Sequence, residues 1–141
     1  MSYTKWFHEH ARKHKKIVDK LLSKGYEKTQ IIEYFDFENM CLEEEDFCPL
    51  YKKHKKCHDL HTLNCYLCAC PNFRFKDEGI EKIEEKIQYS LCNINSKDGR
   101  QGVYGDVIHQ DCSNCSIPHH PSYVEKHFDL DWKKIMDNSM L

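Results

Sequence analysis

The chain has 141 residues, a length typical of one domain. Hydrophobic residues make up 40% of it and the mean hydropathy is -0.79, so we expect a further stabilising link besides apolar burial. The formal net charge of -2 argues against extensive wrapping by nucleic acid. No segment approaches the roughly 20 consecutive apolar residues that a membrane span needs.

The first residues are polar and lack the apolar segment of a secretory signal, which predicts a cytoplasmic location. In a reducing compartment, the nine cysteines are expected to act as metal ligands or redox thiols. Their odd number and their close C-x-x-C spacing likewise argue against a framework of structural disulfides.

Residues 4–24 have the pattern of an amphipathic helix that ends near Gly25. Side chains suited to packing recur along it at steps of three and four, at Phe7, Ala11, His14, Val18 and Leu21. Ile17 and Leu22 are expected to widen this stripe. Residues 28–35 fit a second, shorter helix. We therefore expect a helical hairpin over residues 1–40, packed on a cysteine-rich domain over residues 41–141.

Residues 43–75 show little regular periodicity, as expected for short turns around a metal. Ile80, Ile83 and Ile87 allow a short helix around residues 78–85, whereas residues 86–94 alternate in the manner of a strand. After a turn-rich loop at residues 96–102, residues 103–109 are expected to return as a second strand.

Pro121 suits the first turn of a C-terminal helix. The expected fold is therefore α+β: a small irregular metal-knuckle core with a short β-hairpin, two N-terminal helices and a C-terminal helix.

Charge is unevenly distributed along the chain. Residues 12–24 and 52–56 are basic, and residues 36–46 between them are acidic. The simplest interpretation is that these segments are solvated and pair with one another. In the alternative, the two basic stretches contact a protein or nucleic-acid partner.

Cysteine and histidine gather in two dense groups, at residues 48–71 and 111–120. A C-x-x-C turn places two sulfurs across one ion without strain, so Cys65–Cys68 and Cys112–Cys115 each resemble half of a zinc site. The predicted metal ligands are Cys48, Cys57, His58, Cys65, Cys68, Cys70, Cys112, Cys115 and His119. Their number suits about two zinc ions. Which cysteine joins which ion stays open, and a bridged binuclear cluster is an alternative.

These motifs resemble the cysteine-rich small domain family, which is zinc-finger-like and occurs in anaerobic and microaerophilic bacteria and archaea. The resemblance covers roughly residues 47–120 and rests on Lys-Cys57-His58, Asn-Cys-Tyr-Leu-Cys-Ala-Cys-Pro and Asp-Cys-Ser-Asn-Cys-Ser-Ile-Pro-His-His. It implies a small cytoplasmic metal-binding domain with no established reaction. The chain departs from the family in a longer gap between Cys48 and Cys57.

Zinc is the expected metal because histidines lie close to both groups, and an iron–sulfur cluster is the alternative, since cysteine runs followed by proline recur in iron–sulfur proteins. Other residues are expected to play structural parts. His8, His10 and His14 fit packing or surface positions, His120 fits a position beside the ligands or at the surface, and Cys41 and Cys92 fit small buried positions.

The predicted function is that of a non-catalytic zinc-binding module that interacts with a protein or nucleic acid. Two alternatives stay open: a redox or sulfur-transfer enzyme with an iron–sulfur or catalytic zinc centre, and a metal sensor or trafficking protein. No H-E-x-x-H or deaminase signature is present, so the sequence indicates no known hydrolase.

Overall fold

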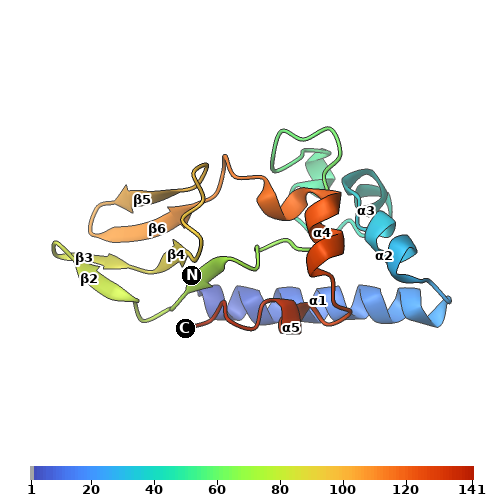
Figure 1. The fold of residues 1–141 in the computed structure, drawn as a ribbon, viewed down its shortest axis with the longest axis horizontal. Coiled ribbons are helices and arrows are strands. Elements are labelled where there is room, and N and C mark those ends of the chain that lie inside the picture. Colours follow the sequence, from blue (N-terminus) through green and yellow to red (C-terminus); the bar gives the residue numbers. More distant parts are fainter. Residues whose placement is uncertain (1) are drawn as a thin grey trace.

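The structure, a computed structural model, describes residues 2–141 and has the predicted α+β fold. Its helices are α1 (Tyr3–Ser23), α2 (Lys28–Tyr34), α3 (Phe37–Glu43), α4 (Pro121–His127) and α5 (Trp132–Ile135), with 3-10 turns η1 (Tyr51–Lys53) and η2 (Ile117–His119). Its strands are β1 (Phe73–Phe75), β2 (Glu81–Ile83), β3 (Lys86–Gln88), β4 (Ser90–Cys92), β5 (Arg100–Tyr104) and β6 (Val107–Asp111). The strands gather at one end of the molecule and α2, α3 and α4 at the other, and α1 starts beside the strands and runs beneath these three helices (Figure 1).

Helix α1 is the amphipathic helix that the sequence predicts at residues 4–24. Its buried face comprises Phe7, His10, Ala11, His14, Ile17, Val18 and Leu21. Leu22, which was expected to widen this face, is 42% exposed. The prediction is wrong for Leu22 because each helical residue turns about 100° from its neighbour, and the core lies on the side of Leu21.

A distant carboxylate fixes the start of α1. The Ser2 side chain accepts a hydrogen bond from the Lys5 amide (3.0 Å) and donates one to Asp77 (2.7 Å). Asp77 also accepts from the Tyr3 amide at 2.8 Å. These bonds satisfy N–H groups that a helix start otherwise leaves unpaired, and they join α1 to the loop after β1.

The second helix lies where it was predicted, as α2, and is followed by α3, which the sequence reasoning missed. Both are fastened to the first cysteine motif by Asn64, which is fully buried. Its side-chain amide donates to the Ile32 carbonyl (2.7 Å) and to the Asp36 carboxylate (2.8 Å). The Cys65 amide donates to the Phe35 carbonyl at 2.8 Å, so the helices position the cysteine turn.

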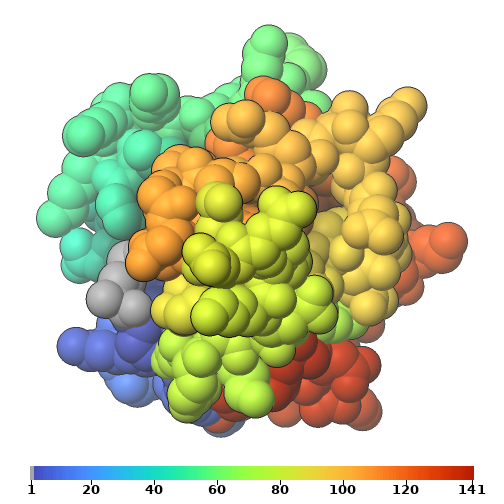
Figure 2. All heavy atoms as spheres, turned by 90° about the vertical axis from the view of Figure 1, so that its left-hand side faces the viewer, coloured from blue at the N-terminus to red at the C-terminus, as the bar shows by residue number. Residues whose placement is uncertain are grey.

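The strands of residues 2–141 form two small sheets. Strand β1 pairs with β4 antiparallel, and the other sheet has the order β2-β3-β6-β5, in which β3 and β6 run parallel. The four-stranded sheet forms the end of the molecule that faces the viewer in Figure 2.

The predictions for residues 78–94 and for the hairpin need correction. Residues 78–85 form β2 and a tight turn instead of a helix, because Glu84 and Glu85 adopt positive φ angles of 49° and 69° and reverse the chain into β3. Residues 86–94 divide into β3 and β4, which belong to different sheets. Two hairpins are formed instead, one by β2 with β3 and one by β5 with β6, and β5 begins inside the loop expected at residues 96–102.

The C-terminal region contains two short helices where one was predicted. Pro121 occupies the first turn of α4, as expected, and Val124 from the same helix is fully buried. Helix α5 then packs on α1, and the Leu141 amide donates to the Phe75 carbonyl at 2.9 Å. One hydrophobic cluster joins side chains from residues 1–40 and 41–141.

The charged segments pair with one another, as the simplest interpretation predicted. Lys20 pairs with Glu44, Lys56 with Glu38 (3.6 Å) and Lys52 with Asp46 (3.5 Å). The basic residues 52–56 therefore lie against the acidic segment. None of the described helices has the length and apolar character needed to cross a membrane.

Candidate metal centre

Three predicted ligands meet at one point. The donor atoms of Cys57, His58 and His119 all lie within 4.8 Å of one another, and no other such group occurs within residues 2–141. Cys57 and His58 come from the loop after η1, whereas His119 ends η2, so segments about 60 residues apart in sequence converge. Sulfur with imidazole nitrogen is a donor set that zinc prefers.

Backbone carbonyls orient both imidazoles toward the sulfur of Cys57. His119 Nδ1 lies 2.9 Å from the Asn64 carbonyl oxygen, and His58 Nε2 lies 2.9 Å from the Cys112 carbonyl oxygen. A carbonyl only accepts, so these two nitrogens carry the protons. The other ring nitrogens, His119 Nε2 at 3.6 Å and His58 Nδ1 at 3.0 Å from Cys57 Sγ, therefore present lone pairs to the same space. Metal-binding histidines are generally held in this way.

Burial keeps His119 ready to act as a ligand. It is 5% exposed, and its pKa lies below the usual value mainly because burial disfavours the charged ring, while the hydrogen bond to Asn64 opposes this. The neutral imidazole is the form that binds a metal. The Asn64 amide also donates to the His119 carbonyl at 2.9 Å, so η2 is held to the first cysteine turn by its backbone.

Three further thiols lie near this group, from Cys48, Cys65 and Cys68. The pKa of Cys68 is raised to about 12, chiefly by burial and then by the charges of the Cys48 and Cys57 thiolates. Burial likewise raises the pKa of Cys65, with added contributions from Cys68, Cys57 and Cys48. Thiols that oppose one another's ionisation in this way are expected to ionise together only beside a cation.

The backbone is strained at the first cysteine motif. Ala69 and Cys70 have positive φ angles of 90° and 61°, a conformation that residues other than glycine rarely adopt. The turn is closed by hydrogen bonds from the Cys68 amide to the Cys65 carbonyl (3.3 Å) and from the Cys70 amide to the Leu67 carbonyl (2.9 Å). Such strain is typical of functional sites, where the surroundings hold the backbone in place.

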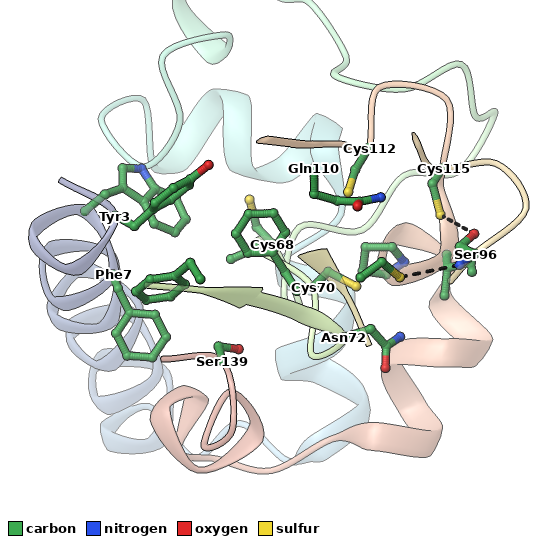
Figure 3. Close-up of a pocket in the computed structure, with 18 of the residues that line it drawn as sticks. Tyr3, Phe7, Cys68, Cys70, Asn72, Ser96, Gln110, Cys112, Cys115 and Ser139 are labelled. Carbon is green, nitrogen blue, oxygen red and sulfur yellow. Dashed lines mark hydrogen bonds between the residues drawn. The ribbon is translucent and has the colours of Figure 1, made fainter. Parts of the chain in front are cut away.

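The other predicted ligands, Cys70, Cys112 and Cys115, line a cavity that the side chains of Cys57, His58 and His119 also line. This cavity has a volume of about 780 Å³ and is lined at different points by Cys57, Cys70, Cys112 and Cys115. Aromatic rings of α1 and β1, among them Tyr3 and Phe7, line another wall (Figure 3). The structure thus does not bring all nine predicted ligands to one point.

The other cysteines and histidines fall partly where they were expected. His10 and His14 are buried packing residues, and His120 is exposed, with its Nε2 3.0 Å from Ser116 Oγ. Cys41 and Cys92 are half-buried instead of fully buried. Cys92 also lines the cavity, a position that the sequence did not predict. The described residues contain no disulfide.

No family model matches this chain, and neither the curated proteins nor the solved structures contain a match. The resemblance to the cysteine-rich small domain family therefore stays a prediction based on its motifs.

Proposed function

We propose that this protein is a metal-stabilised domain in which zinc is held by Cys57, His58 and His119, without a catalytic role. The observation that carries the proposal is the pair of carbonyl-anchored imidazoles, whose free nitrogens face one thiol sulfur. A fourth ligand would come from the adjacent thiols. Cys68 suits this best because it lines the same cavity as the other three side chains.

Such an ion would be the additional stabilising link that we expect from the low mean hydropathy of the chain. Between the end of α3 at Glu43 and the start of β1 at Phe73, the only regular element is η1. An ion shared by this segment and η2 would hold it against the C-terminal part of the chain. Since the unfolded chain does not hold the ligands together, metal affinity then adds to folding stability.

The partner in this proposal is a protein or a nucleic acid, which the module would contact through the basic residues 12–24 and 52–56. The ion pairs of Lys20, Lys52 and Lys56 reduce the positive charge available there. Nucleic-acid affinity that falls steeply between 50 and 200 mM salt, about in proportion to the phosphates contacted, would support the nucleic-acid form. Affinity independent of salt would contradict it.

One observation favours a second candidate function, catalysis at the same ion. The large apolar cavity is lined by Cys57, His58 and His119 themselves, so a ligand in it would lie beside the ion. A catalytic zinc has three protein ligands and an open position for water or substrate. Replacement of Cys68 distinguishes the two functions. If the ion is structural, the variant should bind the metal more weakly and unfold more easily. If the ion is catalytic with three protein ligands, metal affinity and folding stability should both stay unchanged.

The ligand assignment is tested with neighbouring histidines. His119→Ala removes a predicted ligand, and His120→Ala, which removes the exposed neighbour, is the matched control. After purification without added metal, His119→Ala should hold one fewer ion per chain than the wild type and melt at a lower temperature. His120→Ala should keep the wild-type metal content. Full metal content in both variants would overturn the proposed function.

A further inference from the structure

Strand pairing brings Cys92 beside the end of the first cysteine motif. Cys92 in β4 lies opposite Phe73 in β1, and the Phe73 amide donates to the Cys70 carbonyl at 3.1 Å. A hydrogen bond from the Asn93 amide to the Asn72 carbonyl (2.7 Å) fixes the same register. The sheet therefore holds Cys92 near Cys70, although 22 positions separate them in sequence.

The second C-x-x-C motif approaches the same place from β6. Cys112 follows directly after β6, and the Cys115 amide donates to the Cys112 carbonyl at 3.0 Å, which closes the turn. Ser96 contacts two of the sulfurs: its amide donates to Cys92 Sγ at 3.5 Å, and its hydroxyl lies 3.2 Å from Cys115 Sγ. One serine thus lies between thiols of β4 and of the second motif.

All four thiols line the same cavity, and Figure 3 shows Cys70, Cys112 and Cys115 directed toward one another. No three of these sulfurs lie within 4.8 Å of one another, so they surround a wider space than the Cys57 group does. Ligation of one ion by all four would therefore require the sulfurs to move closer together.

The four thiols are at least partly shielded from solvent. Cys115 is buried, and Cys70, Cys92 and Cys112 are half-buried. Four sulfurs that line one cavity in this way are donors that a soft cation prefers.

We propose that Cys70, Cys92, Cys112 and Cys115 form a second, all-thiolate site for a thiophilic metal centre. It goes beyond the proposed function because it uses none of the residues of the Cys57 site. When a zinc ion binds, the four thiols lose their protons to solvent and the sulfurs take the four tetrahedral positions. An iron–sulfur cluster would use the same four thiolates.

The test compares Cys92→Ser with the matched control Cys41→Ser, which removes a thiol that does not line the cavity. Each chain is purified without oxygen or added metal, and zinc, iron and labile sulfide are measured per chain. We expect Cys92→Ser to lose one metal centre and Cys41→Ser to keep the wild-type content. Loss of colourless zinc identifies a zinc site, and loss of iron with labile sulfide identifies a cluster. Equal metal content in both variants would overturn the proposal.

A cobalt measurement keeps the proposal testable if Cys92→Ser does not fold. His119→Ala, loaded with Co²⁺ as the probe, should show thiolate-to-cobalt charge-transfer bands from an all-sulfur centre. Absence of these bands would refute the second site. The two proposals also fail separately: unchanged metal in His119→Ala removes the first site, and unchanged metal in Cys92→Ser removes the second.

Discussion

Acidification should destabilise the protein through His10, a buried histidine far from the cysteines in sequence. Its side chain is 5% exposed and packs against Trp6, Phe47 and Trp132, with ring centroids 4.6, 4.7 and 5.0 Å away. Its Nε2 has no hydrogen-bond partner in the described residues. Burial is the main reason that its pKa falls to about 4 from 6.5, and Lys13 adds to the shift.

The direction of the effect follows from proton binding. Above pH 6.5 the ring is neutral in both the folded and the unfolded chain, so it does not change stability. As the pH falls below 6.5, His10 binds a proton in the unfolded chain, whereas in the folded chain it stays neutral until the pH reaches about 4. The free energy of unfolding therefore decreases as the pH falls from 6.5 to about 4. Between pH 7 and pH 5, the loss from His10 alone is about 2 kcal/mol.

The assay is denaturant unfolding at a series of pH values, with wild type compared with His10→Phe, which keeps an aromatic ring in the same contacts. The variant should lose about 2 kcal/mol less than the wild type between pH 7 and pH 5. Acid release of a metal affects both chains alike and cancels in this difference. His8→Phe, which replaces an exposed histidine of the same helix, is the control. Parallel stability curves for wild type and His10→Phe would refute the reasoning.

Three further outcomes are expected. Leu21→Ala leaves a cavity in the core, because Leu21 is fully buried, and should lower the free energy of unfolding by about 3 kcal/mol in a urea titration; a loss below about 1 kcal/mol would contradict that packing. Asn64→Ala leaves the Tyr66 amide and the Ile32 carbonyl without their partner and should cost about 2–3 kcal/mol by the same titration, whereas an unchanged midpoint would mean that these bonds do not form. Lys15→Ala breaks an exposed pair with Asp19 and should leave the urea midpoint unchanged, so a measurable loss would show an interaction absent from the structure.

Periodicity predicted α1, α2 and α4, whose packing faces are local in sequence, but it missed the short helix α3 and did not separate α5 from α4. The stripe through Phe7, Val18 and Leu21 specifies α1, and Pro121 marks the start of α4. The sheets were harder to predict. Their strands have three to five residues, so alternation has little length in which to show, and the parallel pairing of β3 with β6 depends on contacts distant in sequence.

The candidate site was predictable in composition but not in arrangement. Cys57, His58 and His119 were predicted as ligands because thiols and imidazoles in dense groups are typical of metal sites, and their donor atoms do lie together in the structure. The hydrogen bonds that orient the two imidazoles end on the backbone carbonyls of Asn64 and Cys112. Residue spacing does not predict such bonds because they depend on the folded backbone. The position of Cys92 has the same origin, because it depends on the register between β1 and β4. The sequence shows Cys92 only as a cysteine outside both dense groups.

The central claim, an ion held by sulfur and imidazole nitrogen together, is tested most directly by X-ray absorption at the metal edge of the protein as purified. We expect zinc with a mixed first shell, sulfur at about 2.3 Å and nitrogen at about 2.0 Å. The imidazole rings should add outer-shell scattering that weakens in His119→Ala. A first shell of oxygen alone, or an imidazole signal that His119→Ala leaves unchanged, would contradict the account.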